Sequence, residues 1–311
     1  MRMHQASGRW KLGLLLALVT AGCWATLPVA LKITLEQLDP YTLTWFRFLV
    51  AAVVMLAWLG ARGGLQAFAT LDRKRWYLLA LVALMLIGNY VFYLLGVQQT
   101  TPGNAQLVIQ LAPLLMALGG IFVFRESFRI GQWAGLLIIA VGLFLFFDDQ
   151  LKHSLQSTHD YVLGTGLVVV AAVAWAVYAL VQKQLLTRLS SPAILLSIYV
   201  AASFLLLPLA HPSRLLGLDG RHWLLLGYCA VNTLAAYGAF AEALAHWEAS
   251  RVSAILATTP LLSLGVIALV YFFWPSSIAP EQVTMLGYVG AVLVVAGSAM
   301  SSLLGNRRAG K

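Results

Sequence analysis

Charged side chains are scarce in this chain. Asp, Glu, Lys and Arg make up 10% of its 311 residues, whereas hydrophobic residues make up 61%. A soluble globular domain carries about 25% charged residues. With so few polar side chains, most helices must be apolar on every face, and a lipid bilayer is the natural solvent for such helices. The composition therefore excludes an ordinary soluble domain.

Motifs for nucleotide or metal chemistry are also absent from the sequence. There is no Walker loop, which argues against direct use of ATP, and there is no HExxH, GxSxG or Cys/His metal spacing. The two cysteines, Cys23 and Cys229, lie inside apolar runs and do not indicate a redox compartment. We therefore predict a protein that is not an enzyme, with no catalytic residues, no metal and no cofactor.

Long apolar runs dominate what is present. A membrane span needs about 17–25 mainly apolar residues. Ten segments are candidates, at approximately 12–31, 42–60, 76–97, 105–124, 132–147, 161–182, 192–210, 223–244, 252–273 and 282–304. We therefore predict an all-α membrane protein with ten transmembrane helices and with the lipid bilayer as a partner.

The basic residues between these segments fall mainly on one side of the membrane. If the spans alternate in direction, the side that holds the N-terminus carries 15 of the 20 Lys and Arg residues and the other side carries four, with Arg47 inside a span. Cytoplasmic loops are enriched in Lys and Arg. We therefore predict that both termini are cytoplasmic. The net charge of +9 is then a topology signal and does not indicate nucleic acid as a partner.

Two stretches of the sequence resemble each other. AGCWATLPVALK (21–32) and AVAWAVYALVQK (172–183) each place a Trp eight residues before a Lys. The matched positions are Trp24 and Trp175, Lys32 and Lys183, Trp76 and Trp223, Tyr90 and Tyr237, Pro113 and Pro260, Gly135 and Gly290, and Gly142 and Gly297. Each half holds five predicted spans, and an odd number inverts the second half relative to the first. Inverted-topology repeats are typical of secondary transporters.

The repeat divides the chain into five parts. They are a cytoplasmic N-terminal tail (1–11), a first repeat (12–147), a polar periplasmic linker (148–160), a second repeat (161–304) and a basic cytoplasmic tail (305–311). Lys32 and Lys183 would end their helices at opposite membrane faces. They are either snorkelling cations or groups that serve in gating or substrate binding.

The strongest family pattern lies in NAQLVIQLAPLLMALGGIFVFRESFRIGQWAGLLIIAVG (104–142) and in SRVSAILATTPLLSLGVIALV (250–270). Together with ten spans and the tryptophans of the first and sixth spans, it resembles the drug/metabolite transporter superfamily, in particular its EamA-type members. The turn at Arg125 and Glu126 has no acidic counterpart after the ninth span.

The resemblance implies a secondary active transporter of the bacterial inner membrane. It would export a small organic metabolite, amino acid-like or drug-like, by alternating access around a central cavity. The alternative is a membrane-embedded lipid-modifying enzyme or a lipid flippase. Such an enzyme would require acids and bases gathered at one membrane face, whereas the polar residues here are spread along the spans.

Charged residues within spans are candidates for function, because burying a charge in lipid costs at least about 2.5–3.5 kcal/mol. Arg47 would either anchor a substrate carboxylate or phosphate through its planar fork or satisfy helix-end carbonyls. Glu242 and His246 lie four residues apart on one helix face. They would either couple transport to protons or pair with nearby groups at the cytoplasmic end.

Prolines and polar or aromatic residues within spans complete the predicted site. Pro28, Pro113 and Pro260 predict helix interruptions, and matched interruptions in two repeats point to a transport site. Each polar or aromatic residue would line the cavity or instead serve helix packing. The predicted cavity residues are Trp24, Arg47, Asn89, Tyr90, Tyr93, Gln106, Gln110, Trp175, Tyr178, Asn232, Tyr237, Thr258 and Thr259.

Overall fold

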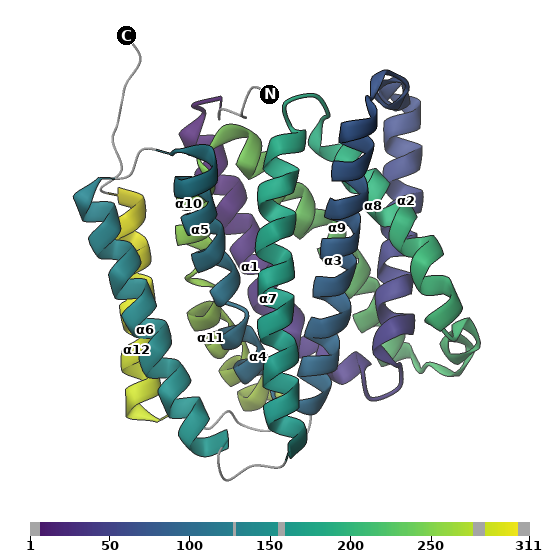
Figure 1. Ribbon diagram of the computed structural model, residues 1–311. Coiled ribbons are helices and arrows are strands. Elements are labelled where there is room, and N and C mark those ends of the chain that lie inside the picture. The colour runs from purple at the N-terminus through teal and green to yellow at the C-terminus, as the bar shows by residue number, and fades with distance from the viewer. Residues whose placement is uncertain (1–6, 127–128, 155–158, 276–283, 304–311) are drawn as a thin grey trace.

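The computed structural model describes residues 7–126, 129–154, 159–275 and 284–303, and every regular element within these ranges is a helix (Figure 1). The first half contains α1 (Trp10–Thr34), α2 (Pro40–Ala61), the 3-10 helix η1 (Gly64–Thr70), α3 (Arg73–Gln99), α4 (Pro102–Val108), α5 (Leu111–Phe124) and α6 (Ile130–Ser154). The second half contains α7 (His159–Leu185), α8 (Ser191–Leu206), η2 (Leu207–Leu209), η3 (Pro212–Gly217), α9 (Gly220–His246), α10 (Ala249–Leu256), α11 (Thr259–Phe273) and α12 (Met285–Leu303).

The predicted class, an all-α membrane protein, is confirmed. Within the described ranges, eight helical segments are long and apolar enough to cross a membrane, with α4–α5 and α10–α11 each counted as one segment. The corresponding stretches of α6 and α12 are shorter, at 130–145 and 285–297. The count of ten spans therefore stays a prediction.

The predicted polar linker, 148–160, is largely taken up by helix. α6 continues to Ser154 and α7 already begins at His159. Residues 155–158 and the predicted tail 305–311 lie outside the described residues, whereas α1 begins inside the predicted N-terminal tail.

The outer surface of the bundle is apolar. Phe122, Phe204 and Phe272 are 70–76% exposed, and they lie on three different helices. A soluble monomer seldom exposes extended apolar patches. Side chains of this kind on several faces fit a surface that lipid covers.

Aspartate residues begin three of the long helices. Asp39 accepts hydrogen bonds from the backbone N–H groups of Tyr41 and Thr42 at the start of α2, where Pro40 occupies the first helical position. Asp72 and Asp219 act in the same way at the starts of α3 and α9. An aspartate at this position satisfies N–H groups that the helix itself leaves free, which is why these helices start where they do.

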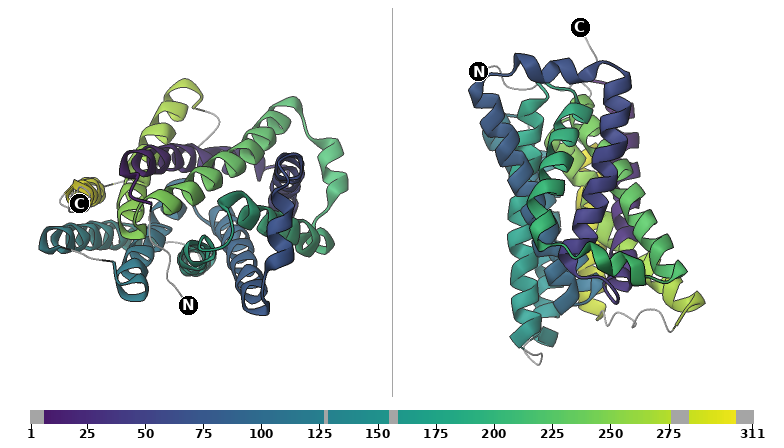
Figure 2. Two further views of the ribbon diagram at one scale, coloured as in Figure 1. Left: turned by 90° about the horizontal axis from the view of Figure 1, so that it is seen from above. Right: turned by 90° about the vertical axis from the view of Figure 1, so that its right-hand side faces the viewer.

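The helices of the two halves pack against one another in matched pairs (Figures 1 and 2). α6 packs against α12 and α2 packs against α8, and the two pairs stand at opposite ends of the bundle in the view from above. Between them, α3 packs against α7 and α1 against α9. α5 also contacts α7 just as α11 contacts α1, and α3 contacts α8 just as α9 contacts α2.

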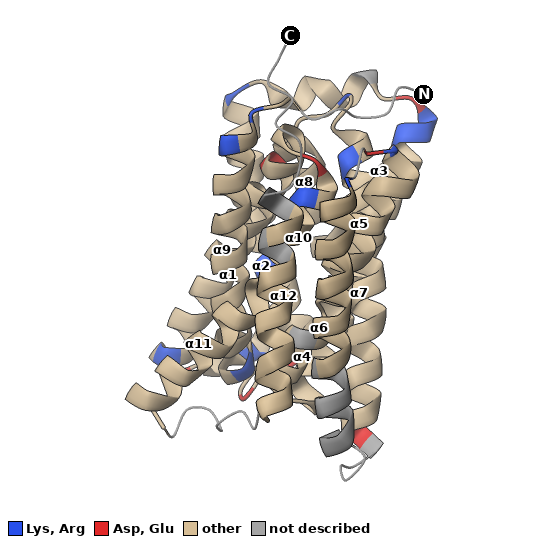
Figure 3. Ribbon diagram, turned by 90° about the vertical axis from the view of Figure 1, so that its left-hand side faces the viewer, with Lys and Arg blue, Asp and Glu red and all other residues tan. Residues whose placement is uncertain are grey.

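α1 begins and α12 ends at one end of the bundle, which we call the terminal end (Figure 1). Gln132, near the start of α6, donates a hydrogen bond from Nε2 to the carbonyl of Ser301, near the end of α12, over 3.2 Å. Most of the Lys and Arg residues in view also lie at the terminal end, as Figure 3 shows. The opposite end carries few of them.

Glycines allow α6 and α12 to approach closely. A Cβ atom added at Gly297 would lie 2.6 Å from the carbonyl oxygen of Gly135 and 2.8 Å from the backbone nitrogen of Ile139. Gly142 similarly faces the carbonyl oxygen of Gly290 at 2.6 Å. Small residues at such crossings let two helix backbones approach in a membrane.

We predict that Gly297→Ala lowers the thermal stability of the protein in detergent, because the added methyl group meets backbone atoms that cannot rotate away. Overpacking of this kind costs about 1–3 kcal/mol. Gly265→Ala is the matched control, since it lies in helix α11 and its Cβ would meet nothing within 4 Å. An unchanged unfolding midpoint for Gly297→Ala would contradict the close packing of α6 and α12.

Candidate substrate cavity

A cavity lies between the two halves of the chain. About 630 Å³ of space free of protein atoms, part of it open to solvent, lies among the lining residues. Its lining consists of Trp24, Leu27, Pro28, Leu31, Arg47, Asn89, Tyr90, Tyr93, Leu94, Gln106, Ile109, Gln110, Ala112, Pro113, Trp175, Tyr237, Leu256 and Thr259. α1 and α3 line it with their C-terminal halves, so the cavity lies toward the end of the bundle opposite the terminal end.

The first of two breaks in membrane helices borders this cavity. α4 ends at Val108 and α5 begins at Leu111. Pro113 has no N–H to donate to the carbonyl of Ile109, which accepts instead from the N–H of Ala112 at 2.9 Å. The side chain of Gln110 bridges the break by donating to the carbonyl of Gln106 at 3.1 Å.

The second break has the same construction in the other half. α10 ends at Leu256 and α11 begins at Thr259, so Pro260 cannot donate to the Leu256 carbonyl. The hydroxyl of Thr259 donates to that carbonyl at 2.6 Å, and the hydroxyl of Thr258 donates to the carbonyl of Ile255 at 2.7 Å. Thr259 lines the cavity, whereas Thr258 is absent from its lining.

The sequence predicted a helix interruption at Pro28, and this prediction is wrong. α1 remains α-helical from Trp10 to Thr34 with Pro28 inside it. Neighbouring helices donate to carbonyls close to the proline, from Asn232 Nδ2 to Cys23 at 2.8 Å and from Ser263 Oγ to Ala25 at 2.8 Å. These bonds hold the helix together, and they turn the amide of Asn232 toward α1 instead of the cavity.

Arg47 is the charged side chain of the cavity lining. It is 1% exposed, its Nε–H donates to the hydroxyl of Thr233 at 3.0 Å, and its guanidinium lies 4.7 Å from the centre of the Tyr90 ring. Among the residues that the structure describes, no Asp or Glu forms an ion pair with it. The sequence predicted Arg47 but missed Thr233, whose only signal was a hydroxyl inside a span.

Aromatic rings from both halves meet beside Arg47. The Trp24 ring centre lies 5.4 Å from those of Trp175 and Tyr237, and the rings of Tyr90 and Tyr237 are 5.5 Å apart. These four residues line the cavity. Tyr178 contacts Trp175 and Tyr237 but is buried behind them, so it packs against the site and does not line it.

Amide side chains supply the remaining polar groups of the lining. Asn89 donates to the carbonyl of Ala171 on α7 at 2.9 Å. The Tyr93 hydroxyl donates to Gln106 Oε1 at 3.1 Å. Gln110 Oε1 is buried and has no hydrogen-bond partner among the described residues, which leaves one acceptor at the first helix break free for a ligand.

Glu242 and His246 lie outside the cavity, which corrects the sequence-based expectation of an internal carboxylate. The Glu242 side chain is 42% exposed, and its Oε2 lies 3.6 Å from His246 Nε2. His246 Nδ1 in turn lies 2.8 Å from the hydroxyl of Ser7. The physical reason is that α9 ends at the terminal end, so both residues sit near that surface.

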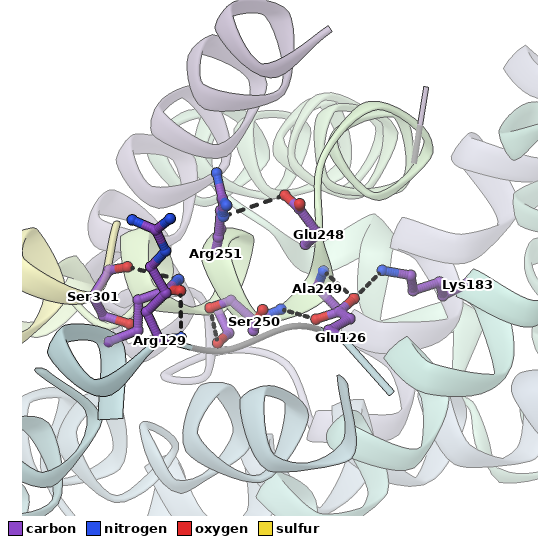
Figure 4. Close-up of polar contacts among 10 residues, drawn as sticks. Glu126, Arg129, Lys183, Glu248, Ala249, Ser250, Arg251 and Ser301 are labelled. Carbon is purple, nitrogen blue, oxygen red and sulfur yellow. Dashed lines mark hydrogen bonds and ion pairs between the residues drawn. The ribbon is translucent and has the colours of Figure 1, made fainter. Parts of the chain in front are cut away.

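What we call the Glu126 junction, formed by Glu126, Lys183 and the first N–H groups of α10, lies at the terminal end (Figure 4). Glu126 Oε1 lies 2.5 Å from Lys183 Nζ and accepts from the N–H of Ala249 at 3.0 Å. Its Oε2 accepts from the N–H of Ser250 at 3.1 Å. A carboxylate at a helix N-terminus satisfies free N–H groups and complements the helix dipole.

Local backbone features aim Glu126 inward. Arg125 ends α5 in a left-handed conformation with φ of 54°, a common way for a helix to end, although glycine is the usual residue there. Gly120 leaves room for the carboxylate, because a Cβ atom there would lie 2.6 Å from Glu126 Oε2. The sequence signals for this junction were the Arg–Glu turn and the lysine at the end of the sixth span.

Burial by itself raises the pKa of Glu126, but the charge of Lys183 and the hydrogen bonds from Lys183 and Ser250 outweigh it and lower the pKa below 4.5. A carboxylate with a lowered pKa contributes stability above its ordinary pKa and loses it as the pH falls through the lowered value. The junction is therefore intact at neutral pH.

Lys32 occupies the matching position at the opposite end. Its Nζ donates to the carbonyls of Val97 and Thr100, both at 2.9 Å, and so ties the end of α1 to the end of α3. The two matched lysines thus hold opposite ends of the bundle. Lys183 does so through a carboxylate, and Lys32 makes these two contacts with backbone carbonyls.

This arrangement, a small-molecule cavity between two helical halves in an apolar bundle, is that of a membrane transporter. The chain belongs to the EamA-like transporter family, whose sequence pattern matches residues 11–148 and again residues 162–303. This agrees with the predicted resemblance to the drug/metabolite transporter superfamily.

Proteins related to this chain over most of its length agree with this assignment. The chain is 39% identical over 308 residues to the Escherichia coli (strain K12) protein named uncharacterized inner membrane transporter YhbE, covering 98% of this chain and 94% of that protein. It is 25% identical over 295 residues to an E. coli protein named probable amino-acid metabolite efflux pump, covering 91% and 92% of the two chains. The protein is therefore an inner membrane transporter, and the lipid bilayer and a small-molecule substrate are its partners.

A solved crystal structure shares the fold. It superposes with a TM-score of 0.71 at 21% sequence identity, covering 96% of this chain and 99% of the other. At this identity the likeness concerns the fold alone.

We predict that Lys183→Met destabilises the protein by about 3–5 kcal/mol, because it leaves the buried Glu126 carboxylate without its counter-charge. The pair is only 2% and 8% exposed. The measurement is the thermal unfolding midpoint in detergent at pH 7. Arg214→Met is the control, since Arg214 is 53% exposed in its pair with Asp39 and such a pair contributes about 0–1 kcal/mol. Equal midpoints for the two variants would contradict a structural role for the junction.

Proposed function

We propose that this protein is a secondary active transporter that exports a small organic metabolite by alternating access around the cavity described above. The observation that carries the proposal is the position of the cavity, at two broken helices that correspond between the halves. Broken membrane helices at matched places form the substrate sites of many secondary transporters. The mixture of aromatic, amide and cationic side chains in the lining suits a small organic metabolite that is amino acid-like or drug-like.

The matched packing of the two halves supports an inverted repeat of ten spans. If α1 to α6 correspond to α7 to α12, exchanging the halves converts the contact of α3 with α7 into that of α9 with α1. The same exchange converts the contact of α5 with α7 into that of α11 with α1. The family pattern also matches the chain twice, once in each half. Two such units can exchange conformations and open the site to either side.

Charge supports an orientation with the terminal end in the cytoplasm. Lys and Arg concentrate there (Figure 3), as they do in cytoplasmic loops. The cavity then lies in the periplasmic half, and the Glu126 junction holds the cytoplasmic half closed. The structure would then represent an outward-facing state. Export requires the junction to open so that substrate can enter from the cytoplasm.

Flux measurements in proteoliposomes test the proposal. We expect purified protein to accelerate the gradient-driven passage of radiolabelled metabolites, without ATP and with saturation. A lipid-modifying enzyme would instead change the lipid composition of the vesicles, and a flippase would move a labelled phospholipid between leaflets. Either of those results without solute flux would overturn the proposal.

Alternating access predicts opposite labelling of two corresponding positions. Tyr93 on α3 lines the cavity, whereas Phe240 occupies the matching place on α9 and is fully buried. In a background without Cys23 and Cys229, we expect Tyr93→Cys to react with a membrane-impermeant maleimide from the periplasmic side. Phe240→Cys should be protected from either side.

Opening the Glu126 junction should invert this pattern. We expect Glu126→Gln to raise the rate at which Phe240→Cys is labelled from the cytoplasmic side, because the neutral amide holds Lys183 and α10 less strongly. Labelling of Tyr93→Cys should fall in parallel. Reaction rates that do not change in the Glu126→Gln background would contradict a gating role for the junction.

A further inference from the structure

We propose that the cavity selects small monocarboxylates that carry a flat apolar group, with Arg47 as the carboxylate anchor, and that it rejects organic cations. The inference rests on the proposed transport function and specifies the substrate class of the same site.

The cavity lining carries one positive charge and no negative charge. Arg47 is the one charged side chain among the residues that line it, and it forms no ion pair with an Asp or Glu that the structure describes. A buried charge without a counter-charge is costly, and a ligand carboxylate would supply that counter-charge. An organic cation in the same space would add a second positive charge at low dielectric.

The free edge of Arg47 favours a carboxylate. Thr233 occupies Nε and the ring of Tyr90 covers one face of the guanidinium. The two terminal nitrogens remain available, and they form a planar pair that matches the two oxygens of a carboxylate. A single guanidinium balances one negative charge, which favours a carboxylate over a doubly charged phosphate.

The rest of the lining is suited to an aromatic or otherwise flat group. Trp24, Trp175 and Tyr237 present rings to the cavity, and Leu31 and Leu94 add aliphatic surface. Offset or edge-on ring contacts stabilise a flat apolar group beyond the burial of its surface. The free Gln110 Oε1 would accept a hydrogen bond from a hydroxyl or N–H group of the ligand.

A matched series of three probes tests the charge requirement. The probes are 3-phenylpropionate, 3-phenylpropan-1-ol and 3-phenylpropylamine, which share one ring and one chain and differ in charge. Binding to the purified full chain in detergent is followed by the shift of the thermal unfolding midpoint and by tryptophan fluorescence. We expect the acid to bind at least about tenfold more tightly than the alcohol, and the amine to bind more weakly than both.

Variants then assign the selectivity to Arg47. Arg47→Gln should weaken binding of the acid at least about tenfold and leave binding of the alcohol unchanged, and Arg47→Lys should have an intermediate effect because it keeps the charge but loses the fork. Trp175→Phe is the control that keeps the charge and shortens the ring system; it should weaken acid and alcohol alike. If the Arg47 variants do not fold, the comparison of the three probes on the unmodified protein still decides the question.

Several results would overturn the inference. They are tighter binding of the amine than of the acid, no binding of the acid, unchanged binding of the acid to Arg47→Gln, or tighter binding of phenyl phosphate than of 3-phenylpropionate. Flux in proteoliposomes separates this failure from failure of the proposed function. Transport of neutral or cationic solutes but not of carboxylates would refute the substrate class and leave the transporter intact, whereas no transport of any solute would refute the transport function.

Discussion

The bilayer interior offers no water to hydrogen-bond a peptide group, and this constraint governs the whole structure. It accounts for an architecture made of helices, in which each peptide group bonds within its own segment. Among the residues that the structure describes, two membrane segments are broken, at 109–110 and 257–258, and both breaks lie at the cavity. There the chain supplies its own partners: the Thr259 hydroxyl serves the carbonyl that Pro260 frees, and the Gln110 amide serves Gln106. Irregular backbone is thus tolerated where it borders the site.

Matched lysines contact different groups at the two ends of the bundle. Lys183 meets a buried carboxylate that also binds two backbone N–H groups of α10, whereas Lys32 donates to backbone carbonyls of the α3 end. If the halves exchange conformations, the Glu126 junction stabilises the state in which it is formed. Opening the junction then requires energy from substrate binding or from another source.

Much of the fold could be predicted because its sequence signals, apolar composition and the breaks between apolar runs, extend over long segments of the chain. The all-helical membrane class, the family and the approximate limits of the long helices could be read from apolar runs, prolines and the Trp–Lys repeat. Ten of the thirteen predicted cavity residues line the cavity, among them Arg47, Gln110 and Thr259. The prediction of an internal carboxylate at Glu242 was wrong, because the sequence gives the depth of a residue in the membrane only roughly. One helical turn near the end of α9 separates an internal carboxylate from an exposed one. Asn232 and Tyr178 do not line the cavity as predicted, because the sequence of a span does not show which face of the helix meets the site.

Partners across the bundle could not be predicted, and they decide what Arg47 does. The sequence offered an anchor or a structural cation, and the difference depends on whether a carboxylate from a distant helix faces it. The described residues supply a hydroxyl and an aromatic face, which are weak partners for a buried guanidinium. Weak partners suit a carrier, which must hold its empty state together and also release its cargo. A permanent carboxylate would fill the anchor, whereas an anchor with no partner at all would be too costly to bury. The hydroxyl of Thr233 and the ring of Tyr90 stabilise the guanidinium to an intermediate degree. A ligand carboxylate can therefore add its own hydrogen bonds to Arg47 and later leave.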